Sequence, residues 1–255
     1  MVIYMITIRK SLVSVITPAY NSEAYIIEAM ESVISQTYIP WEMIIIDDCS
    51  TDNTVEVVRQ YQDKNSNIKL IQLGINQGVA NARNVGIQNA LGQFIAFLDS
   101  DDVWHEEKLE CQIAFMSERD IGFSFTAYRK FSGGINNCGG LIKAPVIVDY
   151  TKLLRGNIIG CLTVVINRQK LSVNYMTKER HEDYIMWLSI LKQGFKAYGL
   201  NKDLARYRLL DTSVSSNKIK SATWTWHIYR NVEGLSFLKS LYCFLHYSYN
   251  ALKKW

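Results

Sequence analysis

Apolar residues in the first half of the chain form short continuous runs that alternate with longer amphipathic segments. Four runs have the length and the branched side chains of buried strands, at residues 12–18, 41–47, 68–73 and 94–99. Because these runs are continuous, each strand is expected to be buried on both faces. Strands of this kind separated by helices predict an α/β fold with a mostly parallel sheet.

The segments between these runs have helical spacing and begin with polar residues that can cap a helix. One helix is expected from Ser22 to about Gln36, and a second one, capped by Thr51 or Asp52, through about Tyr61. A third helix follows a polar loop at residues 74–84. Its apolar positions are Ala80, Val85, Ile87 and Leu91.

The regular alternation stops after Asp102. The pattern there predicts helices at 105–119 and 182–194, strands at 121–126 and 161–167, a loop or hairpin at 131–145, and an aromatic-rich helical tail from about 221. A second half without strand–helix order, packed against a doubly wound half, often supplies the site of a second substrate. We therefore expect two different binding regions in one chain.

Composition narrows the class of protein. The 255 residues, 48% apolar and 20% charged, fit one large domain or one domain with a small annex. The five cysteines form no CxxC pair, which favours free thiols in a reducing cytoplasm over a zinc site. No signal peptide and no run of about 18 apolar residues is present, so no membrane span is expected. The net charge of +4 is concentrated after Ala205 without a recognition motif, which argues against nucleic acid as a partner.

Four polar loops follow the four expected strands, and the carboxyl ends of parallel strands meet at one edge of a sheet. The loops read PAYNSE, DDCSTD, GINQGVANARN and DSDD. The last holds three aspartates, which a solvated loop with Ser100 or Asp102 as a helix cap would explain. An EF-hand calcium loop is excluded, since Trp104 stands where glycine is needed. The remaining interpretation is a D-x-D site that binds Mg²⁺ or Mn²⁺ against a diphosphate.

Four stretches together resemble glycosyltransferase family 2, whose members are inverting enzymes of the GT-A fold. They are VSVITPAYNSEAYIIEAMESVISQT, IIIDDCSTDNTVEVV, NQGVANARNVGIQNALGQFIAFLDSDD, and EDYIMWL followed by LARYR, in the family's order over about residues 12–210. The resemblance implies a UDP-sugar donor, a divalent Mn²⁺ or Mg²⁺ cofactor and a saccharide acceptor. LARYR stands in place of the QxxRW motif of processive synthases, so the similarity is to short, single-addition members that extend lipid-linked bacterial saccharides.

The resemblance also assigns roles to individual residues. Those implied to bind the nucleotide-sugar are Pro18, Tyr20, Glu23, Asp48, Asn76, Gly78, Arg83, Asp99, Ser100 and Asp101. Asp101 is the main metal ligand and Asp99 the second. Asp102, Trp104 and Glu182 are expected in the acceptor site.

An inverting transfer needs a carboxylate that takes the proton of the acceptor hydroxyl. Glu182 and Asp183 stand at a predicted helix start, where the helix dipole keeps carboxylates ionised. Alone they are ordinary first-turn charges. With the upstream motifs, Asp183 resembles the family's base and Glu182 its catalytic neighbour. His181 is expected to face solvent.

The tail beyond residue 233 has Leu235, Leu238, Leu241 and Leu245 at helical spacing, with lysines around them. It fits either a helix docked on the core or an interfacial helix on anionic lipid. An enzyme acting on a polyprenyl-diphosphate saccharide works at the membrane surface, which favours a peripheral location on the inner face of the cell membrane.

The resulting expectation is transfer of a hexose, glucose or galactose, from a UDP-sugar to a lipid-diphosphate saccharide in surface polysaccharide (O-antigen or capsule) synthesis, with a β-linkage. Residues 12–103 would bind the nucleotide-sugar, 104–215 the acceptor, and 216–255 would form the tail. The alternative is a non-catalytic nucleotide-sugar or glycan-binding protein of the same fold. A sugar-phosphate nucleotidylyltransferase is disfavoured, because TPAYNSE lacks the glycine-rich basic loop of that class.

Overall fold

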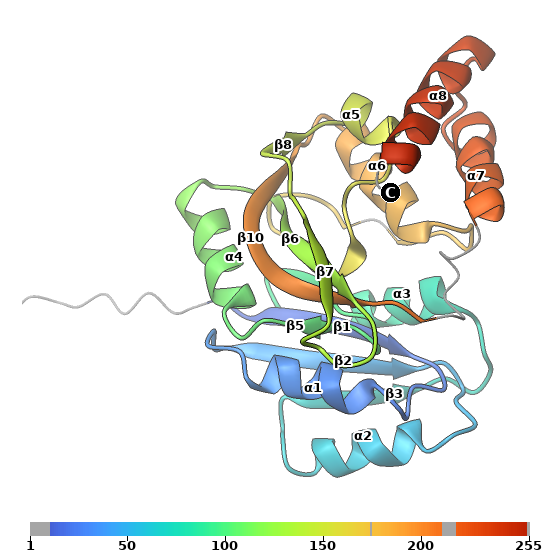
Figure 1. Ribbon diagram of the computed structural model, residues 1–255. Coiled ribbons are helices and arrows are strands. Elements are labelled where there is room, and N and C mark those ends of the chain that lie inside the picture. The colour runs from blue at the N-terminus through green and yellow to red at the C-terminus, as the bar shows by residue number, and fades with distance from the viewer. Residues whose placement is uncertain (1–10, 174, 211–217, 254–255) are drawn as a thin grey trace, which may run out of the picture.

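A mixed β-sheet runs through the centre of the molecule (Figure 1). The computed structural model describes residues 11–173, 175–210 and 218–253. Within these residues the strand order is β3-β2-β1-β4-β9-β6-β10-β5, with β7 paired to β6 and β8 paired to β10. The sheet is continuous across both halves of the chain. The division at residues 103 and 104 stays a prediction, and the one at 215 and 216 lies outside the described residues.

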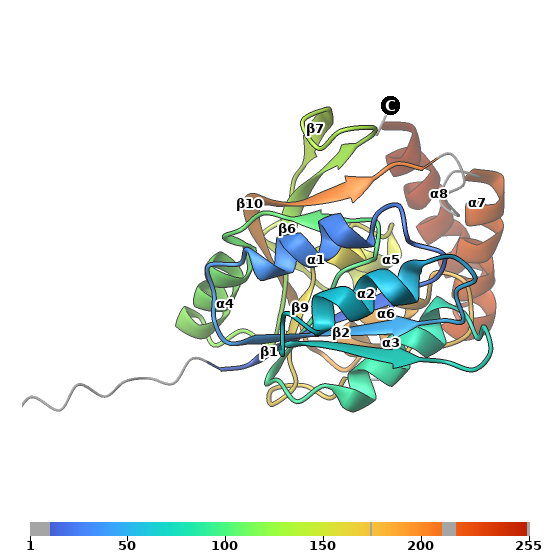
Figure 2. The ribbon, with the colours of Figure 1, turned by 90° about the horizontal axis from the view of Figure 1, so that it is seen from below.

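The first half has the expected strand–helix alternation. Its parallel strands are β1 (Val13–Ala19), β2 (Trp41–Asp47), β3 (Ile68–Gln72) and β4 (Phe94–Phe97), and its helices are α1 (Ile26–Ile34), α2 (Thr54–Gln62) and α3 (Val79–Asn89). Ile16 and Ile44 pack against α3, whereas Val15 and Met43 belong to the cluster that contains α1. Figures 1 and 2 show these helices on the two opposite faces of the sheet, which confirms the predicted coverage.

Three local predictions in this half are wrong. The Ser22 side chain does not cap α1, which begins at Ile26, because its hydroxyl is engaged with Ser100 Oγ at 2.7 Å. Leu91 lies beyond the end of α3 and is 67% exposed, so it does not belong to the apolar face of that helix. The N-cap of α2 is Asn53 rather than Thr51 or Asp52, although Asp52 Oδ1 accepts the N–H of Thr54, the first residue of that helix.

The second half adds antiparallel and parallel strands to the edge formed by β4. Its elements are β5 (Val103–Trp104), α4 (Lys108–Glu118), β6 (Phe123–Phe131), β7 (Cys138–Ile142), β8 (Ile147–Val148), α5 (Tyr150–Leu154), a 3₁₀ turn (Cys161–Thr163), β9 (Val165–Asn167), α6 (Glu182–Lys192) and β10 (Ala197–Arg208). Strands β6 and β7 form the predicted hairpin. The strand predicted from 161 begins only at Val165, after the 3₁₀ turn.

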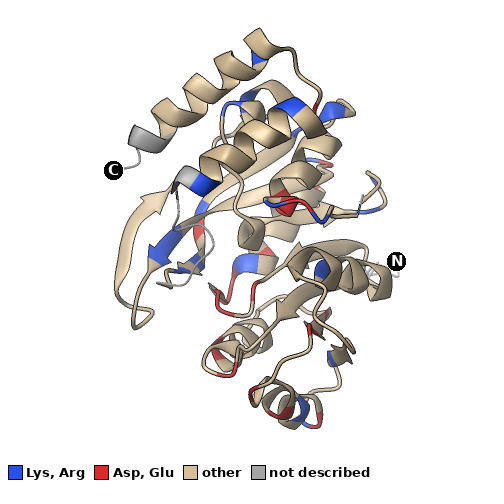
Figure 3. Cartoon of the chain, turned by 90° about the vertical axis from the view of Figure 1, so that its right-hand side faces the viewer, with Lys and Arg blue, Asp and Glu red and all other residues tan. Residues whose placement is uncertain are grey.

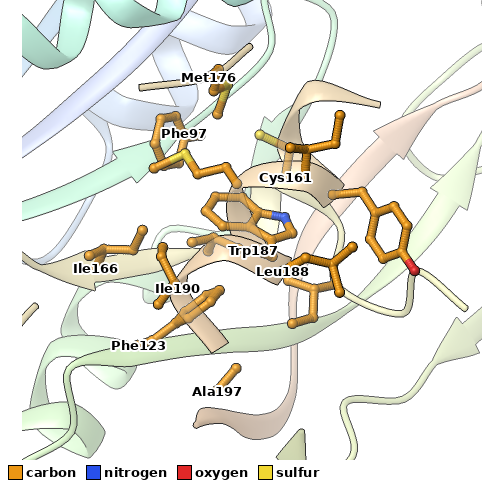
Figure 4. Packing of buried hydrophobic residues seen from close by; sticks show 14 of the residues in the cluster. Phe97, Phe123, Cys161, Ile166, Met176, Trp187, Leu188, Ile190 and Ala197 are labelled. Atoms are coloured by element: carbon orange, nitrogen blue, oxygen red, sulfur yellow. The ribbon is translucent and has the colours of Figure 1, made fainter. Parts of the chain in front are cut away.

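Trp187 fixes α6 on the sheet. Its ring is fully buried, with centroids 5.7 Å from Phe97 of β4 and 5.3 Å from Phe123 of β6 (Figure 4). Cys161 and Met176 surround the same ring in Figure 4. Because this anchor lies in the second turn of α6, the first turn of the helix is held at a fixed place above the sheet.

The C-terminal part is helical, as predicted. Helix α7 (Lys218–His227) continues through a π-helical turn (Ile228–Val232) and is followed by α8 (Phe237–Lys253). Trp226 of α7 makes edge contacts with Phe237 and Phe244 of α8. Among the described residues, no helix combines the length and the apolar character that crossing a bilayer requires. The five cysteines form no disulfide, as expected.

Candidate active site

The four loops at the carboxyl ends of the first-half strands converge as predicted. Asn21 Oδ1 accepts the N–H of Thr51 at 2.8 Å, which joins the first loop to the second. Asp48 accepts the N–H groups of Gln77 and Gly78 at 2.8 and 2.7 Å, which joins the second loop to the third. The hydroxyl contact between Ser22 and Ser100 joins the first loop to the fourth. These contacts hold the loops together at the sheet edge.

The residues expected around the nucleobase lie on these loops. Pro18 is buried within β1, Tyr20 is 50% exposed at its end, and the Glu23 carboxylate accepts hydrogen bonds from Asn53. Asn76 is exposed, and Gly78 has φ +87°, a value that favours glycine. The backbone of the third loop therefore depends on Gly78 for its path and on Asp48 for its anchorage.

Arg83 connects the two halves of the chain. It lies on α3, and its side chain is 5% exposed. Nη2 donates to Asp99 Oδ1 at 2.5 Å, and Nη1 donates to Glu182 Oε1 at 2.6 Å. The sequence placed this arginine near the base and phosphates. That role stays a prediction. In the structure Arg83 lines the cavity, and its two terminal nitrogens join the loop after β4 to the start of α6.

The three aspartates after β4 have different environments. Asp101 lines a cavity together with Asp99, and burial, reinforced by the charge of Asp99, raises the pKa of Asp101 to about 6. Asp102 is 1% exposed, and its Oδ1 accepts the N–H of Arg208 at 2.9 Å. Because two of the three line a cavity and the third is buried, the reading of this stretch as a solvated loop is wrong.

Two residues expected in the acceptor site are buried instead. Asp102 anchors the end of β10, and burial raises its pKa. Trp104 is 3% exposed, its Nε1 donates to the Leu162 carbonyl at 2.8 Å, and the Lys108 ammonium lies 4.0 Å from its ring centroid. Neither side chain lines the cavity, so the structure does not bring them together with the other predicted site residues, and their assignment to the acceptor site stays a prediction. The Trp104 N–H and Asp102 Oδ1 have partners within the protein, whereas Asp102 Oδ2 is buried without a hydrogen-bond partner.

Arg208 was not among the predicted site residues, although it ends the LARYR stretch. Its Nε donates to the Asp101 carbonyl at 2.7 Å, and Nη2 pairs with Glu28 at 2.9 Å. The guanidinium lies 4.4 Å from the ring centroid of Phe131. Arg208 thereby fixes the backbone of the D-x-D turn from the far end of β10. Its place in a matching motif was the sequence signal that could have revealed it.

Glu182 and Asp183 form the first turn of α6, and both line the cavity with Asp99 and Asp101. The Tyr184 N–H donates to Asp183 Oδ1 at 2.7 Å. We expected the helix start to keep both carboxylates ionised. For Asp183 burial, reinforced by the charge of Glu182, outweighs this effect and raises the pKa to about 7.

The cavity has a volume of about 740 Å³, within the range of small-molecule sites. His181 lines it rather than facing solvent, with Nε2 3.1 Å from Ser221 Oγ, and burial lowers its pKa. Aromatic rings of Tyr128, Trp224 and Tyr247 line it from β6, α7 and α8. The C-terminal helices therefore complete the site that the first half begins.

The donor set suits a hard divalent cation bound together with a diphosphate. Asp99 and Asp101 offer two carboxylates on one cavity wall, and no group of three or more His, Cys, Asp or Glu side chains is arranged as a metal cage in the described part of the chain. Mg²⁺ and related ions need few protein carboxylates when phosphate oxygens complete their coordination. Burial is the main cause of the raised pKa of Asp101, and the nearby charge of Asp99 adds to it, so a bound cation would favour the ionised form of Asp101.

A mostly parallel sheet with a D-x-D turn at its carboxyl edge and a second carboxylate pair in the same cavity is typical of a glycosyltransferase of the GT-A type. The family model described as "Glycosyl transferase family 2" matches residues 14–165, and the chain belongs to this family.

Relatives cover almost the whole chain. TuaG of Bacillus subtilis, named as a candidate teichuronic acid biosynthesis glycosyltransferase, is 47% identical over 96% of this chain and 98% of its own length. A second relative is WfgD of Escherichia coli, a UDP-Glc:alpha-D-GlcNAc-diphosphoundecaprenol beta-1,3-glucosyltransferase. It is 40% identical over 95% of this chain and 94% of its own length.

Solved structures share the fold. The crystal structure of S. aureus TarS 1-349 has a TM-score of 0.63 at 27% identity, with 77% of this chain covered and 60% of that one. The mannosyltransferase PcManGT from Pyrobaculum calidifontis, in complex with GDP-Man and Mn2+, has a TM-score of 0.69 at 18% identity. The match covers 89% of this chain and 65% of that one. The predicted GT-A fold is confirmed.

Proposed function

We propose that this protein is an inverting, metal-dependent hexosyltransferase that acts on a UDP-sugar and a saccharide linked to polyprenyl diphosphate, in bacterial surface polysaccharide synthesis. The observation that carries the proposal is one cavity in which the D-x-D carboxylates and Asp183 both lie. The chemistry in WfgD's name, 40% identical along almost the full chain, supports glucose as the sugar ahead of galactose.

Asp183 is the group suited to take a proton from the acceptor. In an inverting transfer the acceptor hydroxyl attacks the anomeric carbon from the face opposite the UDP group. The new carbon–oxygen bond forms as the bond to the phosphate oxygen breaks, and the proton passes to Asp183. With an α-linked donor the product bond is β. A pKa of about 7 suits a general base at neutral pH.

Asp99 and Asp101 are the residues that would hold the divalent cation, and Arg83 and Arg208 keep them in place. A bound Mg²⁺ or Mn²⁺ supplies positive charge that stabilises the leaving diphosphate. Glu182, held by Arg83, keeps a negative charge beside Asp183. That charge favours the protonated form of Asp183 after the hydroxyl proton has arrived.

The deciding experiment measures UDP release from UDP-glucose, UDP-galactose and their N-acetyl forms, with Mn²⁺ or EDTA, and with GlcNAc or GalNAc on a synthetic lipid diphosphate. We expect transfer from UDP-glucose that requires Mn²⁺ or Mg²⁺. Asp101→Asn should lower this rate at least about 100-fold, as loss of a metal or electrostatic contact does in other enzymes. Asp63→Asn, which removes an exposed carboxylate at the end of α2, is the matched control.

Metal-independent transfer would contradict the assignment of Asp99 and Asp101. Tight UDP binding without release from any donor and acceptor would replace the proposal with a non-catalytic nucleotide-sugar-binding protein. Full activity of Asp101→Asn would remove the D-x-D turn from the mechanism.

Helix α8 supports a location at the membrane surface. Leu238, Leu245 and Tyr242 lie on one face and are 78%, 61% and 49% exposed, while Tyr247 on the opposite face lines the cavity. Residues 234–255 contain no acidic residue, and Figure 3 shows no red on α8. An exposed apolar face without negative charge fits an anionic lipid surface. Leu235, which we expected on the same stripe, is 8% exposed and packs inward.

We expect Leu238→Glu/Leu245→Glu to weaken sedimentation with vesicles that contain phosphatidylglycerol by about 100-fold or more, since each buried leucine contributes about 1.5–3 kcal/mol. Leu91→Glu, at a position 67% exposed on another part of the surface, is the control. Equal sedimentation of the double variant and the control would show that α8 does not contact lipid. Loss of a dimer in the double variant would assign the face to a second copy instead.

A further inference from the structure

Three cationic side chains line the active-site cavity and form no ion pair with an acidic residue in the described part of the chain. They are Lys130 of β6, Lys143 just after β7, and Arg180 just before α6. The carboxylates of the cavity come from other segments, the loop after β4 and the first turn of α6. Positive and negative side chains therefore line the same cavity.

Strand alternation explains why Lys130 faces the cavity. Tyr128 and Lys130 stand two residues apart on β6, so both side chains lie on one face of the strand. Ile142 of β7, paired with Tyr128, lines the cavity as well. Arg129 lies on the other face, and its Nε donates to Asp203 at 2.7 Å. Of these two adjacent cations on β6, Arg129 is therefore in a salt bridge and Lys130 is in the cavity.

The three cations differ from other basic residues near the site. Arg83 and Arg208 have carboxylate partners, whereas no described residue forms an ion pair with Lys130, Lys143 or Arg180. Arg180 is positioned by Trp224 of α7, with 5.5 Å between its guanidinium carbon and the ring centroid. Uncompensated cations in a concave site attract an anionic ligand.

Two anions take part in the proposed reaction. The donor diphosphate belongs with the cation at Asp99 and Asp101. In an acceptor such as the GlcNAc-diphosphoundecaprenol in WfgD's name, the sugar that is attacked is bonded directly to the second diphosphate. One sugar ring then separates this diphosphate from the hydroxyl that Asp183 deprotonates. The acceptor diphosphate and the attacked hydroxyl therefore have to fit together in the cavity that Asp183 and the three cations line.

We propose that Lys130, Lys143 and Arg180 bind the diphosphate of the lipid-linked acceptor. This deepens the proposed function and rests on it. A diphosphate esterified at both ends carries about two negative charges, which three cations neutralise through charge-assisted hydrogen bonds. Tyr247 of α8 lines the same cavity, so a lipid chain leaving this site runs toward the helix whose outer face carries exposed leucines.

The test compares Lys130→Gln/Lys143→Gln with Lys64→Gln/Lys196→Gln, which makes the same charge change at exposed positions away from the cavity. Two acceptors are used, GlcNAc-α-diphosphoryl-alkyl and the uncharged GlcNAc-α-alkyl. We expect the cavity variant to lose about 30-fold or more in kcat/KM for the diphosphate acceptor. The kcat/KM of this variant for the uncharged acceptor should change less than about twofold. Its KM for the UDP-sugar should equal that of the wild-type protein. Arg180→Gln should give the same selective loss.

An equal loss with both acceptors would overturn the inference, because the lysines would then act on the cavity as a whole. A raised KM for the UDP-sugar would assign them to the donor instead. If the wild-type protein transfers no sugar, the proposed function fails, and calorimetric binding of GlcNAc-α-diphosphoryl-alkyl to wild type and variant decides this inference separately. Binding that the cavity variant loses would support the anion site, whereas no binding by wild type would overturn it.

Discussion

Asp183→Asn is expected to lower kcat by about 100- to 10,000-fold, the usual contribution of a general base. Asparagine has nearly the same size and still accepts the N–H of Tyr184 through its oxygen, but it cannot take a proton from the acceptor. UDP binding measured by calorimetry should remain, since we expect the loops of the first half to hold the nucleotide. The Asp63→Asn variant should keep the wild-type rate. A variant at position 183 with more than about a tenth of wild-type activity would assign the base to another group.

The pH dependence of the wild-type enzyme follows from the same side chain. Burial and Glu182 raise the pKa of Asp183 to about 7, and a base works only in its deprotonated form. We expect kcat to rise as pH increases through about 7 and to level off above it. Asp101, with a pKa of about 6, must be ionised to bind a cation, so affinity for Mn²⁺ should rise through about pH 6. A rate that is flat between pH 5.5 and 8 would contradict these assignments.

Arg83→Met is expected to lower both stability and activity. The substitution leaves Asp99 and Glu182 without the guanidinium that they share. Breaking a buried pair in this way costs about 3–5 kcal/mol. For a chain of this size that corresponds to a fall in Tm of about 10 °C, measured by calorimetry. Transfer should fall at least about 100-fold, because both carboxylate segments lose their common anchor.

Arg59→Met provides the control for this prediction, since Arg59 is exposed on α2 and its hydrogen bond is to Gln72 at the surface. Its Tm should change by less than about 2 °C. Arg83→Lys keeps the charge but loses the two-pronged geometry, so it should recover part of the stability and little of the activity. An Arg83→Met variant as stable and active as wild type would show that the bridge between Asp99 and Glu182 contributes nothing.

The sequence predicted the first half of the fold and the cavity carboxylates well, because both are encoded locally. Strands β1, β2 and β4 are continuous apolar runs, and Asp99, Asp101 and Asp183 lie in contiguous motifs whose position in the fold is fixed by the strand or helix beside them. Periodicity and motif order carry this information without any knowledge of tertiary contacts.

The sequence did not predict the environments that distant segments make. Asp102 and Trp104 were expected in the acceptor site from the resemblance to the family, but neither side chain lines the cavity. Their partners, Arg208 and Leu162, come from far along the chain and turn both into structural residues. Lys130 and Arg129 are adjacent and equally charged, and only the pairing of β6 with its neighbours decides which one faces the cavity.

The order of strands in the sheet bears on how the chain is completed during synthesis. Strands β1 to β4 are synthesised first, together with the helices that cover both of their faces. The free edge of β4 is paired only when β9 has been made, and β10 must then insert between β6 and β5. A ribosome-bound chain that has released only β4 therefore exposes an apolar, unpaired edge, the kind of surface on which nascent chains associate. Protection of that edge, like the bridge from Arg83 to Glu182, arrives only with the second half of the polypeptide.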